Sequence, residues 1–337
     1  MATPNNESVY RPVLRDAIVT AWQEKRLWPF AVFAAILMSG SVADVFWSKL
    51  NIFAPQASAF STIIPFWEKA SAAWSKLSAT ELILGSLQAF LLVAFGLVIS
   101  CALIIASAIS QAVIVYVIGA RRRGRDITIR DALTVGTRSL WPVLVLNLLT
   151  LAVLMATRSL IAITLSIAMG VPTGLLFTLY LVAFITFTAV SVGAVVIQIY
   201  ALNAMILQGA TLLQGIVRGW NILRRHWIVS IETIALLFLI SAGAYVLVIT
   251  AGMILAIPYL ILLAVATVFG SGFLFLATTI IFMLFFVAIV LSVLAMAVLA
   301  QYAAWTYLYR IFGEGGFLPK IHRIVRSFFH QTKIPGA

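Results

Sequence analysis

The feature that most constrains this chain is a set of apolar runs too long for the core of a soluble domain. No charged residue occurs from Phe273 to Tyr309, and Glu232 is the one charged residue in the run from Trp227 to Val268. About 20 apolar residues suffice to cross a bilayer as a helix. Of the 337 residues, 63% are hydrophobic and 9% are charged, against about a quarter charged in globular domains. We therefore expect a polytopic membrane protein.

A short string marks the start of repeated units. Leu-Trp-Pro at residues 27–29 returns at residues 140–142, and a looser third copy ends at Trp227. Each copy follows a pattern typical of an amphipathic helix, at 13–26, 129–140 and 212–226, and each precedes an apolar run. We interpret this as one unit used three times: an interfacial helix, an anchor at the membrane surface (Trp28, Trp141 or Trp227) and a membrane-spanning hairpin.

The predicted fold is an all-α bundle of six spans, arranged as three repeated hairpins that each follow a cytoplasmic amphipathic helix. Residues 1–9 are expected to be a disordered tail, residues 10–312 the membrane domain, and residues 313–337 a basic cytoplasmic tail. No signal peptide is visible, so we expect the first span to stay in place. The spans are expected at about 27–43, 81–120, 141–168, 175–207, 227–268 and 273–312.

The basic residues predict the orientation. Lys49, Lys69, Lys76 and Arg158 fall on one side of these spans, and the other eighteen of the 22 lysines and arginines fall on the opposite side. Loops rich in basic residues face the cytoplasm. We expect both termini and all three amphipathic helices to be cytoplasmic in a plasma membrane of the bacterial inner-membrane type.

Three glutamines within spans are the first candidates for a polar site. Gln111, Gln198 and Gln301 occupy comparable places in the second helix of each hairpin, and Asn203 follows Gln198 by about one turn. Buried amides are costly unless they are paired. They could line a polar path near the cytoplasmic leaflet, or they could form hydrogen bonds between helices.

Charged residues near the spans allow two further hypotheses. Glu232 lies five residues into a span, so it is either a site in a watery cavity or an interfacial ion pair with Arg224, Arg225 or His226. The arginines expected to contact anionic lipid headgroups are Arg121, Arg122, Arg123, Arg125, Arg224 and Arg225. The net charge of +12 has no accompanying nucleic-acid motif, so we expect membrane lipids, with other membrane proteins as an alternative, and no nucleic acid as partner.

No pattern of catalytic residues is present. The histidines show no metal-ligand spacing, Cys101 is the single cysteine, and the sequence holds no phosphate-binding loop with lysine, no Gly-x-Ser-x-Gly and no His-Glu-x-x-His. We expect no metal and no cofactor.

The segments from Asp131 to Pro142 and from Gly215 to Trp227 place an amphipathic helix with a basic end before a span. In this the chain resembles, over residues 11–310, bacterial six-span membrane proteins that include the membrane domain of some glycerophosphodiester phosphodiesterases. The resemblance implies that catalysis in such enzymes belongs to a separate barrel domain after the membrane part. The sequence ends 25 residues after Phe312, so we expect no such domain here.

Two functions remain open. The first is a non-enzymatic membrane scaffold or accessory protein that organises lipid or a partner protein. The alternative is a transporter or channel with a polar path lined by the intramembrane glutamines and Glu232. An enzyme that acts on lipid within the membrane is a third and weaker hypothesis.

Overall fold

A computed structural model of the chain describes residues 10–37, 79–125, 127–170 and 174–313. This part is helical and contains no strand. The predicted tail at 1–9, nearly all of the tail at 313–337 and the end of the first predicted span lie outside the described residues. The helices are α1 (Tyr10–Gln23), η1 (Lys25–Leu27), α2 (Trp28–Leu37), α5 (Ala79–Arg121), α6 (Ile129–Arg138), α7 (Leu140–Gly170), α8 (Gly174–Gln208), α9 (Leu212–Arg225), α10 (Trp227–Val268) and α11 (Gly272–Gly313).

The predicted helices are confirmed wherever the structure describes them. Short helices α1, α6 and α9 cover the three amphipathic patterns, and five of the six predicted spans correspond to α5, α7, α8, α10 and α11. These five are long and apolar enough to cross a membrane. The first predicted span, 27–43, is described only as α2, which ends at Leu37.

Three helices form the centre of the molecule. Helix α2 packs against α5, α7 against α8, and α10 against α11, while α5, α8 and α11 also contact one another. The C-terminal segments of these three helices, at 107–120, 191–206 and 295–309, hold most of the buried side chains, including Gln111, Tyr200 and Leu299. We call these segments, together with α1, α2, α6 and α9, the hub.

The amphipathic helices close the hub in a cyclic order. Helix α6 packs against α5, α9 packs against α8, and α1 packs against α11. Each short helix therefore covers one of the three central helices. For α6 and α9 that helix immediately precedes them, whereas α1 covers the last helix described.

The junctions before α6 and α9 use the same local chemistry. Gly124 and Gly209 have φ values of +68° and +65° after α5 and α8, a conformation that glycine adopts at no steric cost. Thr128 and Thr211 then accept hydrogen bonds from the backbone N–H of Asp131 and Gln214. The hydroxyls cap the new helices by satisfying otherwise unpaired N–H groups.

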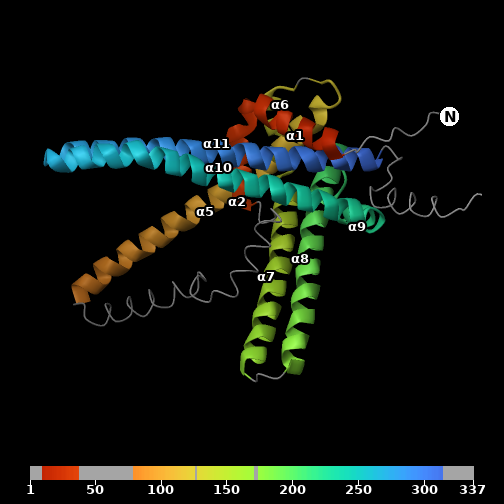
Figure 1. Cartoon of the computed structure of the whole chain (residues 1–337). Helices are drawn as coiled ribbons and strands as arrows, with labels where there is room; N and C mark the ends of the chain where they lie inside the picture. Colours follow the sequence, from red (N-terminus) through yellow and green to blue (C-terminus); the bar gives the residue numbers. More distant parts are fainter. Residues whose placement is uncertain (1–9, 38–78, 126, 171–173, 314–337) are drawn as a thin grey trace, which may run out of the picture.

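Beyond the hub the long helices diverge as three legs: α5 before residue 107, the α7–α8 hairpin and the α10–α11 hairpin. In Figure 1 the α7–α8 leg points down, the α10–α11 leg points left, and α5 points to the lower left. The leg side chains are mostly exposed and apolar, as in the segment of α11 from Phe273 to Leu294. At 1.5 Å per residue that segment is about 33 Å long, close to the roughly 30 Å hydrocarbon core of a bilayer.

Candidate functional site

Helix α9 buries its smallest residues and exposes its largest apolar ones. Gly215 and Gly219 are buried against Ala201 and Ile197 of α8. A Cβ atom on Gly219 would lie 2.8 Å from the backbone oxygen of Ile197, so only glycine permits this close approach. The small-residue face therefore fixes α9 to the hub without using its bulky side chains.

Those bulky side chains form an exposed stripe on the same helix. Leu213, Val217 and Trp220 are 74%, 58% and 54% exposed, and their spacing of four and three residues places them on one face. A separate exposed face of α9 is polar and holds Gln214, Arg218, Asn221 and Arg225. Such a helix, apolar on one exposed side and basic on another, suits the plane between a membrane and water.

Helices α1 and α6 follow the same rule. In α1 the buried residues include Ala17 and Ala21, while Trp22 is exposed. In α6 the buried residues are Ala132 and Gly136, while Leu133 is exposed. Small side chains, together with Val13 and Thr20 in α1, thus face the hub in all three short helices and leave bulky apolar side chains uncovered.

The predicted tryptophan anchors occupy two kinds of position. Trp141 and Trp227 are exposed at the starts of α7 and α10. Trp28 is partly buried. Its Nε1 donates a hydrogen bond of 3.0 Å to the backbone oxygen of Ala21, and its ring packs edge to face against the ring of Trp22. Trp28 therefore also ties α2 back to α1.

The six arginines expected to contact headgroups differ in how many contacts they make within the fold. Arg123, Arg125, Arg224 and Arg225 have exposed side chains at the ends of α5 and α9. Arg122 is also exposed, but its guanidinium lies 4.6 Å from the centroid of the Tyr307 ring and 3.8 Å from the Asp16 carboxylate. Arg121 binds Glu24 and donates a 2.7 Å hydrogen bond to Gln23, so it is engaged within the fold.

Glu24 is a site residue that sequence analysis missed. It is largely buried between α1 and η1, and it forms ion pairs with Arg121 and, at 2.7 Å, with Arg26. Burying a carboxylate is costly unless its charge is paired, and these two arginines supply the pairing. The sequence signal was an acid placed directly before Lys25 and Arg26 at the end of an amphipathic pattern.

Two of the predicted glutamines meet at a residue that was not predicted. Asn147 of α7 exchanges hydrogen bonds with Gln111 at 3.0 and 3.3 Å and accepts one of 2.7 Å from Gln198. Asn147 also donates to the backbone oxygen of Val143. This amide cluster joins α5, α7 and α8 inside the hub through hydrogen bonds between its members.

Gln301 does not join the amide cluster. It lies in α11 and donates a hydrogen bond of 2.8 Å to Ser241 Oγ in α10. The three glutamines are therefore all at hub level, but only Gln111 and Gln198 come together.

Two other predicted polar residues keep a buried oxygen without a partner. In the described part of the chain, neither Glu232 Oε2 nor Asn203 Oδ1 has a hydrogen-bond donor. Asn203 donates to the backbone oxygen of Ile199. The expected ion pair of Glu232 with Arg224, Arg225 or His226 does not form among these residues.

No group of three histidine, cysteine, aspartate or glutamate side chains comes together among the described residues. The expectation that the chain uses no metal and no cofactor remains a prediction.

The fold and the site define an all-helical protein with several helices able to cross a membrane. Comparisons with protein-family models, with curated proteins and with solved structures find no match. The resemblance to glycerophosphodiester phosphodiesterase membrane domains therefore remains a prediction.

Proposed function

We propose that this chain is a non-enzymatic membrane scaffold that gathers anionic lipids around its hub on the cytoplasmic face. The observation that carries the proposal is the arrangement of the three short helices, which are fixed by small residues and leave bulky apolar side chains exposed near arginines. An apolar stripe enters the acyl boundary of a leaflet, and nearby arginines attract anionic headgroups.

The proposal includes six spans built as three repeated units, with both termini in the cytoplasm. The cyclic packing of α1, α6 and α9 on α11, α5 and α8 supports the repeat, as do the matching junctions at Gly124 and Gly209. The excess of basic residues on the hub side of the spans supports the orientation.

Lipid binding by the full-length protein tests this function. The purified chain is placed in nanodiscs with equal amounts of phosphatidylglycerol and phosphatidylcholine, and the lipids retained after detergent extraction are counted by native mass spectrometry. Each basic residue near the surface contributes about 1 kcal/mol to attraction of anionic lipid. Arg224→Gln combined with Arg225→Gln should therefore lower the affinity for phosphatidylglycerol roughly 30-fold, and less of this lipid should be retained.

Arg158→Gln is the matched control, because Arg158 is exposed on α7 outside the hub and falls on the opposite side of the membrane in this orientation. The control should retain phosphatidylglycerol as the unmodified chain does. Equal retention by the double variant, the control and the unmodified chain would contradict the scaffold function.

The transport alternative rests on Glu232, whose Oε2 is buried without a donor in the described residues. Cysteines placed at Gln111, Gln198, Gln301 and Glu232 in a Cys101→Ser background separate the two functions. Reaction of these cysteines with a charged thiol reagent from the aqueous phase would support a polar path. Protection at all four positions would exclude the path and leave the scaffold.

A further inference from the structure

A groove of about 210 Å³ lies where the α10–α11 leg leaves the hub, with Ala35 of α2 on its far side. One part of its wall is aliphatic and includes Val248, Val290, Val293 and Leu294. Among the described residues that line it, none is charged. Pockets that enclose a whole drug-sized ligand measure roughly 300–1,000 Å³, so this groove fits one hydrocarbon chain rather than an entire lipid.

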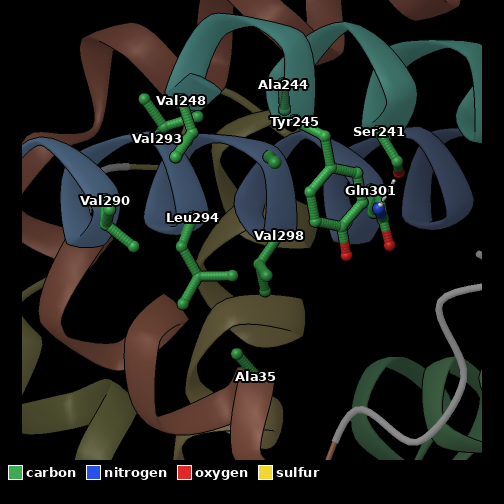
Figure 2. A pocket seen from close by; sticks show the side chains of 11 residues that line it. Ala35, Ser241, Ala244, Tyr245, Val248, Val290, Val293, Leu294, Val298 and Gln301 are labelled. Carbon is green, nitrogen blue, oxygen red and sulfur yellow. Dashed lines mark hydrogen bonds between the residues drawn. The ribbon is translucent and has the colours of Figure 1, made fainter. Parts of the chain in front are cut away.

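The other end of the groove is polar. Figure 2 shows Ser241, Tyr245 and Gln301 together at this end, away from Val290. Gln301 is only 6% exposed, yet its side chain forms part of the wall. A buried amide facing a groove is costly unless a ligand or a neighbour satisfies it.

The hydrogen bonds fix which atom of Gln301 is unsatisfied. Ser241 Oγ donates its single proton to the backbone oxygen of Leu237 at 2.9 Å, so toward Gln301 it can only accept. The Gln301 atom that points to Ser241 must therefore be the donor Nε2, at 2.8 Å. The carbonyl Oε1 is then left as an acceptor, and no donor in the described part of the chain reaches it.

The depth of this acceptor matches the polar layer of a lipid. The exposed leg of α11 ends at Leu294, and Gln301 lies seven residues further on, inside the hub and about 10 Å along the helix from Leu294. If the leg fills the hydrocarbon core, Gln301 lies in the adjoining headgroup and glycerol layer, which extends the bilayer to about 40–45 Å in total.

We propose that the groove binds one acyl chain of a neutral lipid whose free hydroxyl donates a hydrogen bond to Gln301 Oε1, as in diacylglycerol. The aliphatic wall takes the chain, and its continuity with the exposed apolar surface of the α10–α11 leg lets the lipid enter from the bilayer. The absence of charge among the lining residues disfavours a phosphate headgroup at this end. The site does not include the arginine-rich face, so it can be tested independently of the scaffold function.

Photolabelling of the full-length chain in nanodiscs tests the site. The probe is a diacylglycerol with a diazirine in one acyl chain, and the comparison probe is the same lipid with its hydroxyl acetylated. Labelled peptides are identified by mass spectrometry. The free-hydroxyl probe should label Val248, Val290, Val293 and Leu294, and acetylation should reduce that labelling roughly tenfold, as expected for loss of one hydrogen bond.

Two variants separate the hydrogen bond from the shape of the groove. Gln301→Leu should reduce labelling by the free-hydroxyl probe to the level of the acetylated probe, and Val293→Trp should abolish labelling by filling the groove. Leu284→Trp, at an exposed position of the same leg, is the control and should have no effect. Equal labelling by both probes in the unmodified chain, or labelling no stronger at Val293 than at Leu284, would overturn the proposal.

Discussion

Thr20 and Tyr307 share a hydrogen bond of 2.7 Å between Thr20 Oγ1 and the Tyr307 hydroxyl. The two residues are 287 positions apart and join α1 to α11, the first and last helices of the described chain. Both side chains are buried. The bond therefore closes the hub between its two ends.

Removing one partner of this bond should destabilise the closure. Tyr307→Phe leaves the Thr20 hydroxyl buried without its partner, at a cost of about 1–3 kcal/mol. The double variant Thr20→Val and Tyr307→Phe removes both polar groups and should lose less than the sum of the two single changes. Thermal unfolding in detergent measures the difference. Additive losses would contradict a direct interaction.

The amide cluster should behave as a unit. Asn147→Leu leaves Gln111 and Gln198 without their shared partner and should cost about 1–3 kcal/mol of stability. Replacing Gln111, Asn147 and Gln198 together by leucine removes every amide of this cluster and should cost less than Asn147→Leu alone. Unfolding in mixed micelles provides the measurement. A triple variant that loses three times the single effect would show that the amides act independently.

Close packing of α9 should tolerate no added atom at Gly219. Gly219→Ala would place a Cβ 2.8 Å from the backbone oxygen of Ile197, so α9 must shift, at a cost of about 1–3 kcal/mol. Gly243→Ala is the control, because nothing lies within 4 Å of its added Cβ and alanine favours helices by up to about 1 kcal/mol. Hydrogen exchange of α9 should rise only in Gly219→Ala. Unchanged exchange would contradict this packing.

Stability should depend on pH through His226, which lies just before α10. Its ring stacks on Phe312 with centroids 4.4 Å apart. Burial first, and the charge of Arg225 second, lower the pKa of His226 from its usual 6.5. The folded state therefore binds a proton less readily than the unfolded state. The stabilisation of the folded state by neutral His226 is complete above about pH 6.5. It is lost as the pH falls through the lower pKa that His226 has in the folded state.

His226→Phe keeps an aromatic ring at this position and removes the titration. The melting temperature in detergent should fall between pH 7.5 and pH 5 for the unmodified chain, and this fall should be smaller in His226→Phe. The same fall in both proteins would rule out His226 as its source.

Sequence patterns predicted the helices well because each pattern is local. The 3.6-residue period identifies α9, and an unbroken apolar run identifies α10. The contacts between helices were harder to predict, since a period shows which residues share a face but not which helix covers that face. For this reason no sequence pattern could predict that Gln111 and Gln198 would meet at Asn147, or that Gln301 would not.

The partners of charged residues were equally hard to predict from the sequence. A run of arginines at 121–125 indicates a headgroup site, yet Arg121 binds Glu24, which is 97 residues away in the chain. The divergence of the legs and the groove beside Gln301 also depend on how hairpins pack, which no single pattern records. The small-residue stripes at Ala132 and Gly136 and at Gly215 and Gly219 were visible in the sequence, and they could have shown which face of each short helix is buried.

In the proposed scaffold the short helices lie in the membrane surface with their bulky stripe toward lipid. Spin labels on single cysteines in a Cys101→Ser background, in full-length protein reconstituted in liposomes, test it most directly by electron paramagnetic resonance. Labels at Leu213 and Val217 should be accessible to oxygen and shielded from an aqueous nickel chelate, whereas labels at Gln214 and Asn221 should show the reverse. Equal access of the nickel chelate to all four labels would contradict this placement of α9.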